Sequence, residues 1–348
     1  MPRNGMFVRI TLALAAAALL AATVATGASA KRAGVSLTGA GSSFVAPLVQ
    51  KWITPIGSQL GINFSYAAIG SGGGVGDITN RQVDLGMSDA PLSVFNPTCT
   101  TCVQLPWALA GTAVLYHDPG PGLQHIKISG PVLAKIYLGK ITHWNDPALK
   151  KLNPGKNLPS TAITVVHRSD SSGTTYNFTD YLSRISPTWK SQVGTNTTVA
   201  WPVGVGGNHS SGVSAIVSQT PGAIGYADVD YAHVNHLDFF RVENASGNFI
   251  IPTLKTIGAA AQLDTKPAAD GSLSIVNPPK SAKYKNAYPI CTYTYVDAQQ
   301  DSGTHAVYDK KLLNWAVTTG QSFGPALFFV PLPAPVVAFD KKQIKKIA

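Results

Sequence analysis

Residues 35–60 read VSLTGAGSSFVAPLVQKWITPIGSQL, and this stretch decides the class of fold. The short apolar strand at 35–37 runs into a turn of glycine and serine at 39–43, and residues 47–60 then have the spacing of an amphipathic helix. The same order returns at 62–81, where an apolar strand precedes the glycine run of residues 70–74 and a helix expected from about 75 to 81. Repeated strand, turn and helix units are typical of α/β domains.

The alternation of strands and helices continues to the end of the chain. We expect further strands at 83–87, 108–116, 163–166, 221–226 and 288–296, and further helices at 129–138, 175–185, 212–219, 307–318 and 334–346. With 348 residues the chain is long enough for two α/β domains, each with its own core. The apolar run at 323–339 is interrupted by prolines and is not expected to span a membrane.

The net charge is +10, from 27 Lys and Arg against 17 Asp and Glu, yet charged residues make up only 13% of the chain. About 25% is ordinary, so the protein is basic because acidic residues are scarce. Apart from the short run at 341–346, Lys and Arg are dispersed rather than clustered. This distribution argues against a nucleic-acid partner.

The first thirty residues have the features of a secretory signal peptide. Arg3 and Arg9 precede the apolar run at 10–24, and Ala28-Ser29-Ala30 supplies a cleavage pattern. A membrane-anchoring helix is the alternative, but the run ends before the roughly 20 apolar residues that a bilayer requires. No cysteine lies near the cleavage site, so a lipid anchor is not expected. We expect a periplasmic or otherwise extracytoplasmic protein from which residues 1–30 are removed.

The chain has three cysteines: Cys99, Cys102 and Cys291. In an oxidising compartment the close pair Cys99 and Cys102 could form a disulfide, although free thiols and a zinc half-site are alternatives. A zinc site would need a second pair of ligands with matching spacing, and the sequence shows none, so no metal is expected. Cys291 falls in an apolar strand and is expected to be a core residue.

Three loops share one layout, in which a strand, a turn of Gly with Ser or Thr, and a helix start follow one another. A helix N-terminus presents unpaired N–H groups and a partial positive charge, and small residues there allow an anion to approach closely. The alternative is that these Ser and Thr residues are ordinary helix caps with nothing bound. The three loops are Ser42-Ser43-Phe44, Ser71-Gly72-Gly73 and Ser172-Gly173-Thr174.

Arg168 and Asp89 make the anion hypothesis more specific. Arg168 adjoins the third loop, and its guanidinium can donate to two oxygens of a tetrahedral anion, although a surface ion pair with Asp170 is the alternative. Asp89 can only accept while it is ionised, so beside an anion it would favour a ligand that still carries a proton. Hydrogen phosphate carries one and sulfate does not. The alternative for Asp89 is a turn residue before Pro91.

The chain resembles the PstS family, the periplasmic phosphate-binding proteins of the high-affinity phosphate ABC transporter. The matching segments cover essentially the whole mature chain and occur in the order of the family. They are LTGAGSSF at 37–44, IGSGGGV at 69–75, VDLGMSDAPLS at 83–93, IYLGKI at 136–141, RSDSSGT at 168–174, WPVGVGG at 201–207 and PGAIGY at 221–226.

The resemblance implies a periplasmic-binding-protein-like fold, with two α/β lobes joined by hinge strands and the ligand in the cleft. It implies a discontinuous first lobe of residues 31–117 plus 289–348 and a second lobe of residues 118–288. Asp170 matches the acid that orients the arginine, and Ser43 stands where the family often has threonine. The implied phosphate ligands are Ser43, the backbone of Phe44, Ser71, Asp89, Arg168, Ser172, Gly173 and Thr174.

The chain departs from the family pattern around Cys99 and Cys102 and across residues 245–285. These departures affect the surface of the lobes rather than the expected site.

We therefore expect a monomeric, non-enzymatic receptor that captures inorganic phosphate without a cofactor and delivers it to the permease and ATPase subunits of an ABC transporter. The alternatives are a receptor for another oxyanion such as sulfate, a secreted phosphatase or serine hydrolase, and a scaffold protein that uses the basic C-terminal helix. The eight histidines form no grouping in sequence that would support hydrolysis.

Overall fold

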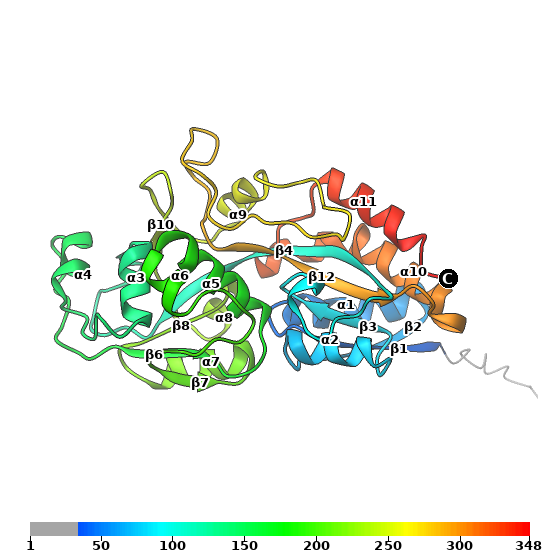
Figure 1. Cartoon of the computed structure of the whole chain (residues 1–348), viewed down its shortest axis with the longest axis horizontal. Helices are drawn as coiled ribbons and strands as arrows, with labels where there is room; N and C mark the ends of the chain where they lie inside the picture. The colour runs from blue at the N-terminus through cyan, green and yellow to red at the C-terminus, as the bar shows by residue number, and fades with distance from the viewer. Residues whose placement is uncertain (1–33) are drawn as a thin grey trace, which may run out of the picture. The chain divides into compact units, whose positions relative to one another are not determined.

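Strand β4 (Cys102–Tyr116) runs through the middle of a nine-stranded sheet in the computed structural model, which describes residues 34–348 (Figure 1). The strand order is β2-β1-β3-β12-β4-β8-β6-β7, and the short β9 also pairs with β4. The parallel pairs are β1 with β2 and β3, and β6 with β7 and β8. The expectation of an α/β fold is confirmed.

The remaining strands of this sheet are β1 (Val35–Gly41), β2 (Ile62–Ala67), β3 (Leu85–Ser88), β6 (Thr164–Arg168), β7 (Val205–Gly207), β8 (Ala223–Asp228), β9 (Asp238–Phe239) and β12 (Cys291–Gln299). A second sheet has the order β11-β10-β5 and consists of β5 (Lys127–Ile128), β10 (Arg241–Glu243) and β11 (Phe249–Ile250).

The α-helices are α1 (Ala46–Leu60), α2 (Ser71–Thr79), α3 (Gly130–Tyr137), α4 (Pro147–Leu152), α5 (Gly173–Ile185), α6 (Pro187–Gln192), α7 (His209–Gln219), α8 (Val229–Val234), α9 (Leu254–Ala261), α10 (Ala306–Ala316) and α11 (Ala334–Ile344). Short 3-10 helices are η1 (Leu92–Val94), η2 (Gly303–His305), η3 (Thr319–Phe323) and η4 (Pro325–Leu327).

Strand β4 changes partner along its length and so joins two halves of the sheet. Residues 102–111 pair antiparallel with β12, and residues 112–116 pair antiparallel with β8. We call β2-β1-β3-β12 with its helices the first half, and β8-β6-β7 with its helices the second half. The change of partner lies between Gly111 and Thr112. The limits that we expected for two lobes, 31–117 plus 289–348 and 118–288, remain a prediction.

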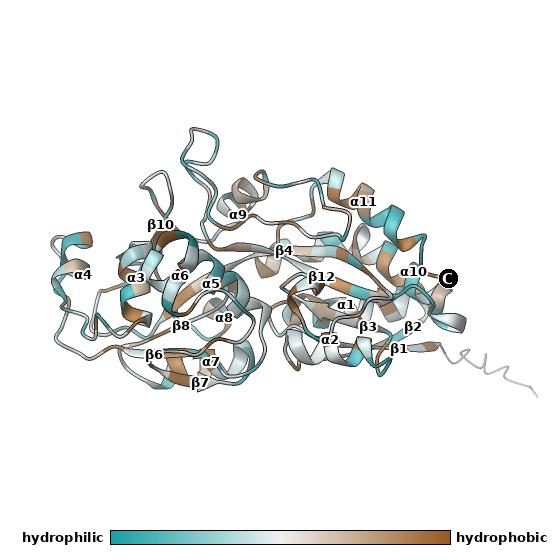
Figure 2. Ribbon diagram, in the orientation of Figure 1, coloured by the Kyte–Doolittle hydropathy of each residue, from teal (hydrophilic) through white to brown (hydrophobic). Residues whose placement is uncertain are grey.

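Buried aromatic side chains hold the helices to each half. In the first half Trp52 of α1 packs edge-on against Trp107 of β4, with ring centroids 5.1 Å apart. In the second half Phe178 of α5 stacks on Tyr226 of β8 at 4.3 Å. Such pairs contribute about 0.5–1.5 kcal/mol each beyond the burial of their area. Figure 2 shows both hydrophobic and hydrophilic residues on α11, as expected of a helix with one buried side, which includes Val336.

Three helices begin at least two residues earlier than we expected. We expected α2 to start near residue 75, α5 near 175 and α7 near 212, whereas they start at Ser71, Gly173 and His209. The glycine run therefore belongs to α2 rather than to a turn before it. At Gly74 an added Cβ would lie 2.4 Å from the carbonyl oxygen of Ala40, so glycine is required where α2 passes close to β1.

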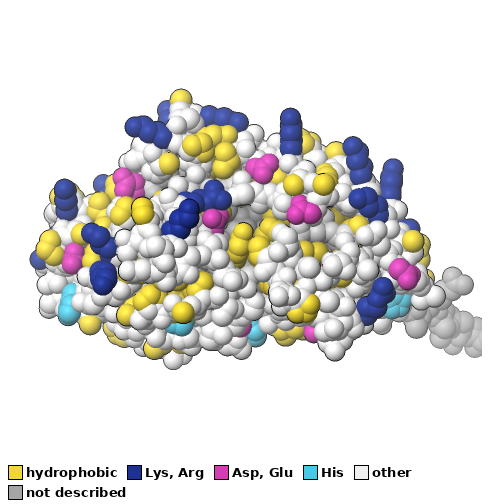
Figure 3. Space-filling view, viewed as in Figure 1, with side chains coloured by type: hydrophobic (Ala, Val, Ile, Leu, Met, Phe, Trp, Pro, Cys, Tyr) yellow, Lys and Arg dark blue, Asp and Glu magenta, His cyan; other side chains and the backbone are white. Residues whose placement is uncertain are grey.

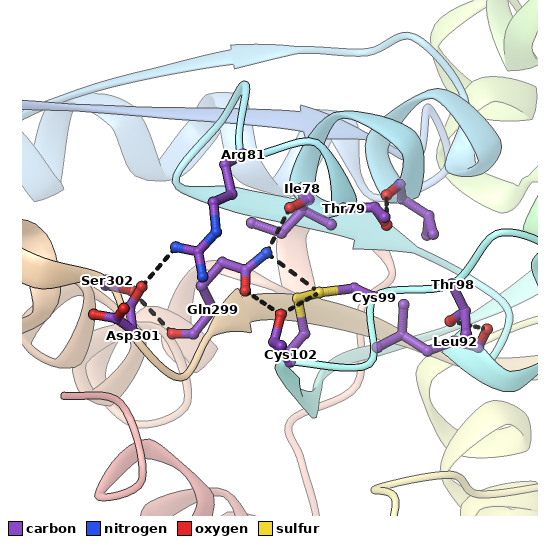
Figure 4. Close-up of a disulfide and its surroundings, with 12 residues drawn as sticks. Ile78, Thr79, Arg81, Leu92, Thr98, Cys99, Cys102, Gln299, Asp301 and Ser302 are labelled. Atoms are coloured by element: carbon purple, nitrogen blue, oxygen red, sulfur yellow. Dashed lines mark hydrogen bonds between the residues drawn. A yellow bond between two sulfur atoms is a disulfide. The ribbon is translucent and has the colours of Figure 1, made fainter.

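Cys99 and Cys102 form a disulfide, which was one of the alternatives that the sequence left open. Gln299 of β12 lies against it and donates from Nε2 to the carbonyl oxygen of Ile78 at 2.8 Å and to Sγ of Cys99 at 3.3 Å (Figure 4). The disulfide thus packs between α2 and β12. Cys291 is a buried free thiol in β12, as expected.

Within residues 34–348 no helix is both long enough and apolar enough to cross a bilayer. The expected signal peptide, residues 1–30, lies outside the described residues, so its cleavage remains a prediction. In that same part of the chain, no cluster of three or more His, Cys, Asp or Glu side chains could hold a metal ion.

Candidate anion-binding site

The N-termini of four helices meet between the two halves of the sheet. Helices α1 and α2 follow strands of the first half, and α5 and α7 follow strands of the second. Two hydrogen bonds join them in pairs: Gly173 N–H donates to Ser71 Oγ at 3.0 Å, and Ser210 N–H donates to Ser43 Oγ at 2.9 Å. Four helix dipoles therefore point their positive ends at one region, which suits an anion.

Asp89 lies at the centre of this region with a side chain that accepts on both oxygens. Ser42 Oγ donates to Oδ1 at 2.5 Å, and Thr174 Oγ1 donates to Oδ2 at 3.2 Å. Only 1% of Asp89 is exposed. Burial raises the pKa of Asp89 to about 6, although the two hydroxyl donors and the charge of Arg168 act to lower it. Asp89 is therefore largely an ionised acceptor at neutral pH.

Arg168, at the end of β6, is buried and held by Asp170. Its Nε donates to Oδ1 of Asp170 at 2.7 Å and its Nη2 donates to Oδ2 at 2.5 Å. Burial would raise the pKa of Asp170, but the bonds and charge of Arg168 hold this pKa below its ordinary value. Because only 3% of Arg168 is exposed, the pair is not the surface ion pair that the sequence left open. Its Nη1 remains directed toward Ser210 Oγ, at 3.4 Å.

The structure brings the expected ligand residues together, and the loops that carry them bond to one another. Ser43 Oγ donates to Ser210 Oγ at 3.0 Å, and Phe44 N–H donates to Ser42 Oγ at 3.0 Å. Ser172 caps α5, since its Oγ accepts from Thr175 N–H at 3.1 Å. The capping role that the sequence allowed is thus present at Ser172, and whether it also binds a ligand remains a prediction.

Close packing explains the glycine in the third loop. A Cβ added to Gly173 would lie 2.6 Å from the backbone nitrogen of Asp89 and 2.7 Å from that of Ala90. Glycine therefore lets the start of α5 touch the backbone after β3. A side chain at this position would push the two loops apart.

Sequence reasoning missed Ser42 as the donor to Asp89 and missed Ser210 entirely. The glycine turn at 204–207 before α7 has the same layout as the three loops that we singled out, and this signal could have included Ser210. No comparable signal separates Ser42 from Ser43, because adjacent serines in a turn differ only in where the backbone directs them.

Among the described residues, no histidine ring is hydrogen-bonded to a serine of this region. His167 adjoins Arg168 in sequence, but its Nδ1 contacts the carbonyl oxygen of Arg168 at 3.0 Å and its ring stacks on Trp201 at 4.7 Å. Among residues 34–348 no hydrogen bond joins a histidine ring to a serine hydroxyl, the pairing that activates a serine nucleophile.

Formal charge does not make this site attractive to an anion. It contains one guanidinium, Arg168, against two carboxylates, Asp89 and Asp170, so oriented N–H and O–H dipoles must provide the attraction. On the face drawn in Figure 3, Lys and Arg are scattered rather than gathered in one patch. At physiological salt their influence is screened beyond about 8 Å.

The fold and the site together define the chain as a periplasmic-binding-protein-like, two-lobed α/β protein with a polar site between its halves. Comparison agrees with this class, since the PBP superfamily domain matches residues 23–319. The chain is 38% identical over 323 residues to the phosphate-binding protein PstS of Xylella fastidiosa (strain Temecula1), covering 89% of this chain and 84% of that protein. It is 38% identical over 314 residues to PstS of Pasteurella multocida, covering 89% and 90%. The chain therefore belongs to the PstS family.

A solved structure shows the same fold. The periplasmic phosphate-binding protein PfluDING, bound with phosphate, superposes with a TM-score of 0.70 at 22% sequence identity, covering 88% of this chain and 93% of that one.

Proposed function

We propose that this protein captures inorganic phosphate and delivers it to an ABC transporter for import. The observation that carries the proposal is the buried carboxylate of Asp89, placed among helix N-termini and hydroxyl donors beside Arg168. Because both oxygens of Asp170 already accept from Arg168, Asp89 is the carboxylate that can accept from a ligand, and the other groups around it are donors. Such a site favours a tetrahedral anion that donates one hydrogen bond and accepts the others, which describes hydrogen phosphate.

We assign the binding roles by the chemistry of each group. Asp89 accepts the ligand's proton, Arg168 donates from its guanidinium while Asp170 holds it in place, and Thr174 donates from its hydroxyl. The hydroxyls that now bond across the two halves would turn toward the ligand when it enters. The remaining proposed donors come from the three loops and are Ser43, the backbone N–H of Phe44, Ser71, Ser172 and the backbone N–H of Gly173.

The PstS relatives are phosphate-binding proteins by name, which supports a binding role rather than an enzymatic one. We propose a monomer without a cofactor and without a nucleic-acid partner, whose partners are the permease and ATPase subunits of the transporter. We place it in the periplasm or outside the cytoplasmic membrane, exported by a signal peptide at residues 1–30.

Isothermal titration calorimetry of the mature chain with inorganic phosphate tests the proposal. We expect one ligand per chain and little change in apparent affinity when sulfate is present in large excess. Arg168→Ala should weaken binding strongly, whereas Arg241→Ala, at an exposed arginine in β10, should not. Equal affinity for phosphate and sulfate would favour the alternative of a general oxyanion receptor, and no heat with either anion would remove the proposal.

A further inference from the structure

A cavity of about 400 Å³ lies directly behind the anion-binding site. It is bounded by α5, by β12 and by the segment of residues 264–275, and Asp89, Asn177 and Thr292 are among its lining residues. The carboxylate of Asp89 accepts from Ser42 and Thr174, whereas its carbonyl oxygen accepts from Asn177, which also lines the cavity. The side chain of Asp89 thus belongs to the anion-binding site, and its backbone carbonyl is bonded by a residue that lines the cavity.

Asn177, in the first turns of α5, bonds the backbone of Asp89 and the backbone of its own helix. Its Nδ2 donates one hydrogen to the carbonyl oxygen of Asp89 at 2.6 Å and the other to the carbonyl oxygen of Gly173 at 2.9 Å. The side chain is buried, with 6% exposed. Because both neighbours are carbonyl oxygens, which only accept, the amide nitrogen must be the atom that faces them.

The bond from Asn177 to Asp89, like that from Tyr231 Oη to the carbonyl oxygen of Ser43 at 2.8 Å, differs from three other bonds between the two halves. Those from Gly173 to Ser71, from Ser210 to Ser43 and from Thr174 to Asp89 use groups to which we assign ligand contacts. A bound anion would compete for those groups. Asn177 instead bonds a backbone carbonyl outside the site, so its bond can persist with ligand present.

From this geometry we infer that Asn177 is a positioning residue for selective phosphate binding. It ties the start of α5 in the second half to the backbone of Asp89 in the first half. Thr292 Oγ1 of β12, in the first half, lies 3.3 Å from the same carbonyl oxygen, but its one hydrogen has a nearer acceptor in the carbonyl oxygen of Tyr293 at 2.7 Å. The inference rests on the proposed function, because it assigns to Asn177 the placement of the carboxylate that recognises the ligand's proton.

Two consequences follow for binding. Loss of the bond should let the two halves separate more easily, so phosphate should dissociate faster while its association rate changes little. Asp89 should also lose its fixed position, so the exclusion of sulfate should weaken. If Asn177 served only the stability of the fold, its loss would leave the ratio of phosphate affinity to sulfate affinity unchanged.

Asn177→Asp is the sharpest variant, because it keeps the shape of the side chain and turns two donors into acceptors facing two carbonyl oxygens. Asn177→Ala removes the bonds without adding charge. The matched control is Asn314→Asp in α10, where Nδ2 also bonds the carbonyl oxygen four residues earlier, that of Lys310, at 2.8 Å but contacts no second loop. Stopped-flow dissociation rates and calorimetric affinities for phosphate and for sulfate are measured on all variants.

We expect phosphate to dissociate about tenfold faster from Asn177→Ala and faster still from Asn177→Asp, with a smaller ratio of phosphate to sulfate affinity and with no change in Asn314→Asp. If Asn177→Asp does not fold, Asn177→Ala decides the outcome. Wild-type dissociation rates and affinity ratios in the folded variants would overturn the inference. Failure of the wild-type chain to bind phosphate would instead overturn the proposed function.

Discussion

Ser42 donates its hydroxyl hydrogen to Oδ1 of Asp89 at 2.5 Å, and both residues are buried. The same Ser42 oxygen accepts from the backbone N–H of Phe44 at 3.0 Å and from that of Val45 at 3.4 Å, at the start of α1. The Ser42 hydroxyl therefore links the N–H groups at the start of α1 to the carboxylate of Asp89. This chain of donors stabilises the charged form of Asp89 in a place where burial opposes it.

The first prediction concerns Asp89→Asn. An asparagine is neutral and can donate as well as accept, so a fully deprotonated anion no longer meets a repulsive acceptor. We expect sulfate affinity to rise by at least tenfold, and the ratio of phosphate to sulfate affinity to fall accordingly. Competition calorimetry with both anions measures the ratio. An unchanged ratio would show that Asp89 does not select the ligand.

The second prediction follows from the pKa of Asp89, which burial raises to about 6. As the pH falls through this value, Asp89 takes up a proton and becomes a donor. The binding of sulfate should therefore strengthen between about pH 7 and pH 5, and Asp89→Asn should lose this dependence. Titrations of sulfate at several pH values, with the variant alongside, provide the measurement. A flat profile in the wild type would contradict the assignment.

The third prediction concerns Arg168→Lys, which keeps the charge and removes the planar fork. Asp170 now accepts two parallel bonds from the guanidinium, and an ammonium cannot make both while also reaching a ligand. We expect phosphate affinity to fall by roughly tenfold to a hundredfold. Calorimetry gives the affinity, with the exposed Arg241→Lys as the control. Wild-type affinity in Arg168→Lys would show that charge alone is enough.

The fourth prediction concerns the disulfide between Cys99 and Cys102. Replacing both cysteines by serine should lower the free energy of unfolding by about 2 kcal/mol, the value expected for a short closed loop. Phosphate affinity should stay near that of the wild type, because the disulfide packs against α2 and β12 away from the proposed ligands. Denaturant unfolding and calorimetry separate the two effects, and Cys291→Ala controls for loss of a thiol. A large fall in affinity would tie the disulfide to the site.

The fifth prediction concerns stability and pH. Burial raises the pKa of Asp309 to about 7 and that of Asp340 to about 8. Between its unfolded and folded pKa values such a carboxyl binds more protons in the folded state, so stability is lost as pH rises through this window. The ligand-free protein should therefore melt at a higher temperature near pH 5 than near pH 8. Asp340→Asn should reduce the difference, and a melting temperature that rises with pH would contradict it.

Much of the fold could be predicted because it depends on local patterns. The strand, glycine turn and helix order of residues 35–60 appears as β1 and α1, and the ends of α10 and α11 lie within two residues of those that we expected. The start of α2 was misplaced, because glycine is weak evidence for a helix until the close approach to Ala40 is known. Such an approach joins distant residues and leaves no local signal.

The sequence analysis named most residues of the site but not the hydrogen bonds that join them. The loops at Ser71 and Gly173 are linked by a hydrogen bond, although they lie far apart in sequence. Ser210 and Asn177 were overlooked, because serine and asparagine near a helix start are common caps and gain meaning only from their partners.

Of the seventeen acidic residues, six are buried: Asp89, Asp228, Asp230, Asp297, Asp309 and Asp340. Among residues 34–348, Lys and Arg side chains that are not buried therefore outnumber Asp and Glu side chains that are not buried, even though Arg168 is buried as well.

The sequence by itself determined the α/β class, the order of the elements and the family, because periodicity, glycine turns and motif order are properties of the chain. Only the tertiary structure decided which hydroxyl meets Asp89, that Arg168 is buried, and which residues join the two halves of the sheet. These are contacts between residues distant along the chain, and they depend on the packing of helices against a common sheet. The energy of a buried charge is set by that packing, which no local stretch of sequence contains.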